Sequence, residues 1–247
     1  MSNEPPPPSN GSPPPEGPPQ PPPDDGDDYV VSIKGVRALP SEDEGQLNLE
    51  IETTRGTLRA YIHPCEGKTG CVVFVGGAAG GVDGPANGVY LRLARDLVAQ
   101  GISSLRLEYR EAGEFTECVL DTLAACSVLK GLGAQRAVVV GHSFGGAVAI
   151  KAGELAPLAT AVVGMSSQRF GTQDVDRLGK PLLLVHGADD QVLLAAASDD
   201  IFQRAEEPKR LVILEGTGHG LREVADDVYN LLSDYIRQAV GEAPAEG

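Results

Sequence analysis

The sequence predicts an α/β fold, in which a mostly parallel β-sheet carries helices on both faces and follows an N-terminal β-hairpin. Short apolar runs alternate with longer helical patterns from residue 71 to residue 240, and this is the order that βαβ units produce. The first of these runs, 71–75, is apolar throughout and ends in two glycines. That pattern is typical of a strand buried on both faces of a parallel sheet.

The individual elements follow in chain order. Apolar residues alternate with polar ones over 47–51 and again over 58–62, on either side of an Arg55-Gly56 turn, which predicts the hairpin. Further strands are predicted at 71–75, 103–109, 137–140, 161–165, 182–185 and 211–214, and helices at 89–100, 118–129, 145–155, 195–205 and 221–240. The last helix repeats its apolar residues close to the 3.6-residue period of an α-helix.

Three segments are expected along the chain. Residues 1–28 are rich in Pro, Gly and Asp and hold no large apolar residue between Met1 and Tyr29, so they cannot offset the entropy of ordering. We expect a disordered tail there, acting as a spacer in preference to a PxxP ligand. Residues 29–240 form one domain of the predicted α/β type, and 241–247 form a disordered stub.

Charge and composition exclude several classes of protein. The formal net charge is −15 and no Lys/Arg cluster is present, so nucleic acid and anionic membranes are poor partners. No apolar run reaches the length of a membrane span. Because no basic segment followed by an apolar stretch is seen near Met1, we expect no secretory signal and a cytoplasmic location, with the four cysteines as free thiols.

A metal site is not expected. His63, Cys65 and Cys71 lie close together in the sequence, but no paired CxxC or HxxxH spacing accompanies them. We predict no metal and no cofactor.

The most informative segment runs from Gly141 through Ser143 to Gly145 and has the pattern G-x-S-x-G. It directly follows a predicted buried strand and directly precedes a predicted helix, the context in which this pattern marks a nucleophilic serine. The glycines on either side suit the strained backbone of such a turn. The N–H of Phe144, in the first helical turn, is placed to stabilise an oxyanion.

A serine hydroxyl needs a base, and the chain has four histidines. His63 lies in the hairpin, His142 neighbours the serine but is expected to point away from it, and His186 ends a buried strand as a packed, hydrogen-bonded residue. His219 remains. It follows the strand 211–214, at the carboxyl edge of the sheet where catalytic groups gather.

The acid is sought at the same edge. Asp189 and Asp190 both follow the strand 182–185, and only one of them can orient His219. Asp174 and Asp176 are weaker candidates.

These residues together resemble the α/β-hydrolase superfamily, and more narrowly the small dienelactone-hydrolase-like serine esterases. The resemblance covers residues 46–240 and is carried by the G-x-S-x-G segment, by the HGxxD-like run 186–190 and by Gly218-His219. It implies an α/β-hydrolase fold and the triad Ser143, Asp190 and His219, because the acid of that pattern is the fourth residue after its histidine.

The resemblance also bears on the oxyanion hole and on the cover of the site. The family's HG turn appears here as Gly76-Gly77, with glycine in place of histidine. By position, the N–H of Ala78 is the implied second oxyanion donor, with Gly77 as second choice. The family's helical cap has too little room between Met165 and Pro181, so we expect no cap domain. The loop 82–87 is the candidate for a small lid over the site.

The functional expectation is a hydrolase that cleaves small carboxylic esters through an acyl-enzyme. A thioesterase or a hydrolase of small peptides and amides would use the same triad. A different class of alternative is a catalytically silent interaction protein that displays the Pro-rich tail.

Overall fold

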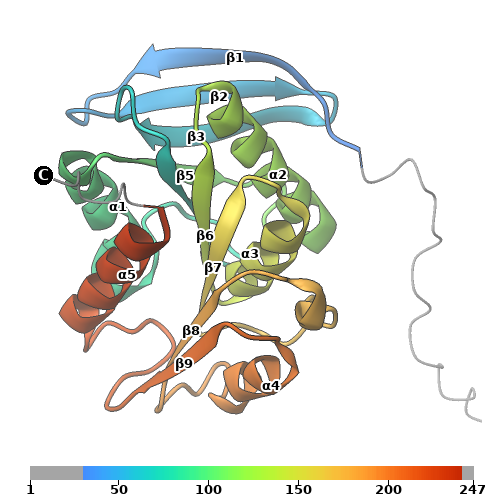
Figure 1. Cartoon of the computed structure of the whole chain (residues 1–247), viewed down its shortest axis with the longest axis vertical. Helices are drawn as coiled ribbons and strands as arrows, with labels where there is room; N and C mark the ends of the chain where they lie inside the picture. The colour runs from blue at the N-terminus through green and yellow to red at the C-terminus, as the bar shows by residue number, and fades with distance from the viewer. Residues whose placement is uncertain (1–29, 241–247) are drawn as a thin grey trace, which may run out of the picture.

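The structure, a computed structural model, describes residues 30–240. The predicted disordered tail (1–28) and C-terminal stub (241–247) lie outside the described residues, as does Tyr29 at the start of the predicted domain. Within 30–240 the expected α/β-hydrolase fold is confirmed, with helices on both faces of a mostly parallel sheet (Figure 1).

A nine-stranded sheet forms the centre of the molecule, in the order β1-β2-β3-β5-β4-β6-β7-β8-β9. Its strands are β1 (Ile33–Pro40), β2 (Leu47–Thr53), β3 (Gly56–His63), β4 (Gly70–Val75), β5 (Ile102–Glu108), β6 (Arg136–His142), β7 (Ala159–Met165), β8 (Leu182–Gly187) and β9 (Lys209–Leu214). The pairs β1–β2, β2–β3 and β3–β5 are antiparallel, and all pairs from β5 onward to β9 are parallel. The predicted hairpin is β2–β3, and it extends the parallel sheet at one side.

Five α-helices cover the two faces. They are α1 (Pro85–Leu97), α2 (Phe115–Gly131), α3 (Phe144–Leu155), α4 (Ala196–Arg204) and α5 (Ala225–Val240), and two short 3₁₀ turns span Val98–Gln100 and Val175–Arg177. Side chains of α1 and α5 belong to one buried cluster, and side chains of α2, α3 and α4 belong to the other. The two sets of helices lie on opposite sides of the sheet (Figure 1). The sheet is therefore the middle layer of three.

The strand β4 is the first central strand, as its sequence predicts. All six of its residues are buried, and it lies between β5 and β6. From β4 the chain continues to β5 on one side, whereas from β6 it continues to β7 on the other. The carboxyl ends of β4 and β6 thus flank a switch point, where Val75 pairs with Gly141, and such a point is where ligands of open parallel sheets bind.

Two parts of the fold differ from the sequence-based expectation. The edge strand β1 was not predicted, because nearly all of its residues are exposed on both faces and show no alternation of apolar and polar side chains. The last helix begins at Ala225 and not at Leu221. Leu221 has a φ of 53° and is fully buried, so an apolar residue that fits the helical period belongs to the preceding turn.

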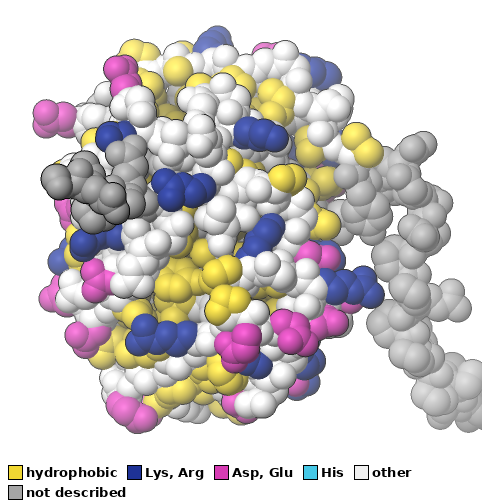
Figure 2. Space-filling view, in the orientation of Figure 1, with side chains coloured by type: hydrophobic (Ala, Val, Ile, Leu, Met, Phe, Trp, Pro, Cys, Tyr) yellow, Lys and Arg dark blue, Asp and Glu magenta, His cyan; other side chains and the backbone are white. Residues whose placement is uncertain are grey.

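The connection from β7 to β8 holds one 3₁₀ turn and no cap domain within the described residues, as expected. No helix between residues 30 and 240 combines the length and the apolar character needed to cross a membrane. On the face shown in Figure 2, Lys and Arg side chains are scattered among acidic and neutral ones.

Candidate active site

Ser143 occupies a sharp turn between β6 and α3. Its φ of 60° and ψ of −122° lie outside the helical and extended regions, so the backbone is strained there. A Cβ at Gly141 would lie 1.9 Å from the carbonyl oxygen of Gly145, and a Cβ at Gly145 would lie 2.1 Å from that of Gly76. The turn therefore requires both glycines of the G-x-S-x-G pattern, and the N–H of Ser143 is held by the carbonyl of Met165 at 2.8 Å.

His219 is brought to this serine by the loop after β9. Its Nε2 lies 3.1 Å from Ser143 Oγ, which is hydrogen-bond distance. The loop is fastened on its far side, since Ala86 N–H donates to the carbonyl of Gly220 at 2.8 Å and Asn87 Nδ2 donates to the carbonyl of Arg222 at 3.3 Å. The position of the imidazole thus depends on two loops that are far apart in the sequence.

Asp190 completes the arrangement. Its Oδ2 lies 2.8 Å from His219 Nδ1, and its Oδ1 accepts the N–H groups of Val192 and Leu193 at 2.8 and 2.9 Å. Burial acts to raise the pKa of Asp190, but the hydrogen bonds from His219, Leu193 and Val192 outweigh it, and the pKa lies below its ordinary value. The carboxyl group is therefore an anion at neutral pH, beside the ring nitrogen it orients.

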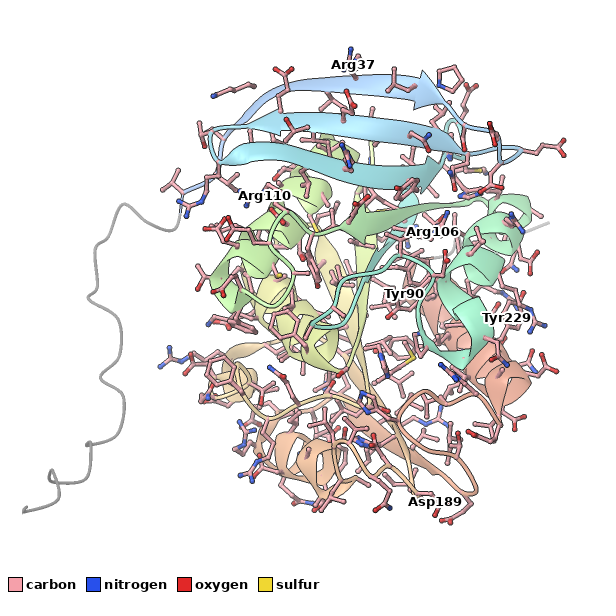
Figure 3. The ribbon with its side chains drawn as sticks, turned by 180° about the vertical axis from the view of Figure 1, so that it is seen from behind. Arg37, Tyr90, Arg106, Arg110, Asp189 and Tyr229 are labelled. Carbon is pink, nitrogen blue, oxygen red and sulfur yellow. The ribbon has the colours of Figure 1, made fainter. Side chains whose placement is uncertain are left out.

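The neighbouring Asp189 plays no part in this contact. Its side chain is exposed and points outward at the margin of the molecule (Figure 3). Of the two adjacent aspartates, the structure brings Asp190 to His219.

His142 is the site residue that the sequence interpretation missed. It was expected to point away from the serine, but its ring lies against that of His219 with centroids 4.8 Å apart, and its Nε2 lies 2.8 Å from the His219 carbonyl oxygen. His142 is the last residue of β6, directly before the turn at Ser143. The alternation of side chains along a strand therefore does not predict where the His142 side chain points. Burial lowers the pKa of His142 to about 4, which keeps the ring neutral.

The other two histidines are buried. His186 hydrogen-bonds Ser198 and Asp190 and is packed as expected, although its contact with the carboxylate was not foreseen. His63 ends β3, and both of its ring nitrogens lack a hydrogen-bond partner among residues 30–240. Burial, together with Arg106 and Arg95, lowers the pKa of His63.

A cavity of about 970 Å³ opens beside Ser143. It is lined by the segment 76–88, which comprises the loop after β4 and the start of α1, by residues of the loop after β9 between 218 and 223, and by His142 and Ser143. The segment 82–87, considered as a lid, is part of this wall and is tied down at Asp83, which pairs with Arg106 at 2.8 Å.

The expected oxyanion donors lie around the serine as follows. Phe144 is the first residue of α3, where its N–H has no intrahelical acceptor. Ala78 and Gly77 line the cavity, and a Cβ at Gly77 would lie 3.9 Å from Ser143 Cβ. The isolated bridge between Gly77 and Gly80 holds this part of the loop.

No group of three or more His, Cys, Asp or Glu side chains among residues 30–240 is arranged to hold a metal ion. The groups described above are those of acid, base and nucleophile chemistry.

Comparisons with known proteins concern the fold. No family model and no curated protein sequence matches the chain. Among solved structures, it is similar to dienelactone hydrolase from Anabaena variabilis, with a TM-score of 0.69, 18% identity and coverage of 79% of this chain and 98% of that one. Est1E from Butyrivibrio proteoclasticus has a TM-score of 0.68 and 16% identity over 78% of this chain and 98% of its own.

The esterase domain of a Rhodothermus marinus protein is also similar, with a TM-score of 0.64 and 20% identity over 84% of this chain and all of that one. These identities are low, so the likeness lies in the arrangement of the elements. The chain therefore has the α/β-hydrolase fold, in the form similar to dienelactone hydrolase.

Proposed function

We propose that the protein hydrolyses small carboxylic esters through an acyl-enzyme, with Ser143 as nucleophile, His219 as base and Asp190 as the group that orients His219. The observation that carries the proposal is the continuous chain of hydrogen bonds from Asp190 Oδ2 through the His219 ring to Ser143 Oγ. It ends at a cavity able to admit a substrate.

The proposed reaction has two halves. His219 Nε2 takes the proton of Ser143 as Oγ attacks the acyl carbon, and the N–H of Phe144 with that of Ala78 or Gly77 stabilises the oxyanion. When the intermediate collapses, His219 returns the proton to the leaving alcohol. Water then gives its proton to His219, attacks the acyl-enzyme and releases the acid, which restores the Ser143 hydroxyl.

Two features support an ionised Asp190 in this role. Its four hydrogen-bond donors are all N–H groups, and its pKa lies below the ordinary value. An anion beside Nδ1 stabilises the imidazolium that forms when His219 takes the serine proton.

Labelling with a fluorophosphonate probe tests the proposal, because the probe reacts with a serine whose proton is removed by a base. We expect covalent labelling of the full-length protein at Ser143, none in Ser143→Ala, and normal labelling in the control Asp189→Asn. A panel of activated esters, thioesters and amides then separates the ester proposal from the two related hydrolases. A folded protein that is neither labelled nor active on any of them would favour the silent interaction protein.

A further inference from the structure

The contacts of His186 form a second set of hydrogen bonds behind Asp190. His186 lies at the end of β8, four residues before Asp190, and its side chain is completely buried. Its Nε2 lies 3.1 Å from Asp190 Oδ2 and 2.8 Å from the carbonyl oxygen of Leu193, and its Nδ1 lies 2.7 Å from the hydroxyl of Ser198.

These partners assign the protons of the ring. A carboxylate and a carbonyl oxygen only accept hydrogen bonds, so Nε2 of His186 carries a proton and donates to both. In the neutral ring Nδ1 is then an acceptor, and the hydroxyl of Ser198 donates to it. Ser198 lies in α4 and is itself fully buried, so its hydroxyl fits the tautomer that Asp190 and Leu193 impose and holds the ring of His186 at Nδ1.

The acceptor positions of the Asp190 carboxylate are all occupied. Oδ1 accepts two backbone N–H groups, and Oδ2 accepts Nδ1–H of His219 and Nε2–H of His186. A carboxylate offers about four acceptor positions, so all are used and the group cannot rotate. Oδ2 also divides its negative charge between two imidazoles.

We propose that His186, held in place by Ser198, is a positioning residue that holds the Asp190 carboxylate in place and limits the basicity of His219. This inference rests on the proposed function. The titratable groups facing His186 are Asp190, with His219 and His142 beyond it. Since His142 is held neutral by burial, the charge that His186 modulates is that of the Asp190–His219 pair.

The test compares variants of His186 in the full-length protein. His186→Leu removes both ring nitrogens, whereas His186→Gln places an amide nitrogen at about the distance of Nε2 and keeps a donor to Asp190. We expect kcat on an activated ester to fall about 10- to 100-fold in His186→Leu, the range typical when a partner of an active-site ligand is removed. KM should change little, and His186→Gln should recover most of the loss.

The pH profile distinguishes positioning from a merely structural role. Without the Nε2–H donor, Oδ2 keeps more negative charge and stabilises the His219 imidazolium better, so the acidic limb of kcat/KM should move up by about half a pH unit in His186→Leu. Ser198→Ala should move it in the same direction by less, because the His186 ring then loses only the hydrogen bond at Nδ1 that holds it against Asp190. His63→Leu and Ser233→Ala, which remove another buried imidazole and another buried helical hydroxyl, should leave the profile unchanged.

The outcomes separate the two proposals. If the parent protein is labelled at Ser143 and turns over ester, but His186→Leu keeps the parent pH profile and kcat while folded, the positioning role is wrong and the proposed function stands. If His186→Leu does not fold but Ser198→Ala does, a Ser198→Ala pH profile equal to that of the parent protein likewise shows that the positioning role is wrong. A parent protein that is not labelled overturns both.

Discussion

Three imidazoles surround the Asp190 carboxylate and the Ser143 hydroxyl, and their partners set what each can do. His219 contacts both groups, His186 contacts the carboxylate from behind, and His142 donates to the backbone carbonyl of His219. Identical side chains thus differ in role because each ring nitrogen meets a different acceptor or donor.

The two adjacent aspartates give a matched comparison. Asp190→Asn should lower kcat/KM on an activated ester by about 10³- to 10⁴-fold, because an amide cannot stabilise the imidazolium and permits the wrong tautomer. Asp189→Asn makes the same chemical change at an exposed side chain and should alter kcat/KM less than about threefold. Steady-state kinetics of both variants check the assignment, and a larger loss in Asp189→Asn would reverse it.

His142 should make the stability of the protein depend on pH. Its pKa is about 4 in the folded state and about 6.5 when unfolded, so protons bind more readily to the unfolded chain. Above pH 6.5 the ring is neutral in both states, and it does not change the free energy of unfolding. As pH falls from 6.5 to about 4, the unfolded chain takes up the proton first, and the free energy of unfolding falls by at most about 3 kcal/mol.

Urea unfolding at pH 7.5 and pH 4.5 measures this loss, and His142→Phe should show a smaller difference between the two values than the parent protein. His63 acts in the same direction in both proteins and does not affect the comparison. An equal pH difference in both would contradict the assignment.

At the scale of elements, the loops after β4 and β9 support one another. Ala86, Asn87 and Gly88, at the start of α1, all have left-handed backbone angles, and the first two donate hydrogen bonds to the loop that carries His219. Non-glycine residues in the left-handed region cost conformational energy, and they persist only where surrounding contacts offset that cost. The turn is therefore part of the support of the loop that carries His219.

Substitution of Asn87 separates backbone conformation from hydrogen bonding. Asn87→Val places a β-branched side chain at a φ of 58° and should destabilise the protein by about 1–2 kcal/mol, with a lower kcat. Asn87→Gly permits the angle and loses only the side-chain donor, so its melting temperature should stay nearer to that of the parent. Thermal unfolding and ester kinetics of both variants test this, and a Gly variant less stable than the Val variant would contradict it.

Sequence reasoning recovers the elements whose pattern is strong. The buried strands and the helices behind them were predicted to within a few residues because continuous apolar runs and the 3.6-residue period are local signals. The strand β1 has no such signal, since an edge strand with little burial selects no alternation.

The site divides in the same way. Ser143 and His219 were predicted because strand ends and glycine turns mark their positions in the sequence. The contact of His142 with His219, and that of Ser198 with His186, join residues that are 77 and 12 positions apart. They depend on loop paths that no local pattern encodes.

The hydrophobic core of the described domain consists of side chains from its own strands, helices and turns. Two clusters of buried side chains lie on the two faces of the sheet, and every member lies between residues 49 and 240. The strand β1 adds exposed residues at the edge. Apart from Met1, the composition of residues 1–28 offers no large apolar side chain to either cluster.

Removal of residues 1–28 should therefore leave the melting temperature and the ester turnover unchanged within error. Differential scanning calorimetry and steady-state kinetics of the full-length and shortened proteins check this. A melting temperature lower by several degrees would show that the tail contributes to folding.

Glycines form a large part of the wall of the cavity beside Ser143. Eight of the residues that line it are glycines, and Gly80, Gly81, Gly84 and Gly88 have positive φ angles that other residues rarely adopt. These glycines offer no side chain to exchange, so the shape of that part of the wall follows the path of the loops. We therefore expect insertions and deletions in these loops to change substrate preference. The Ala78-Ala79 segment is exposed, so an insertion there should disturb the packing least.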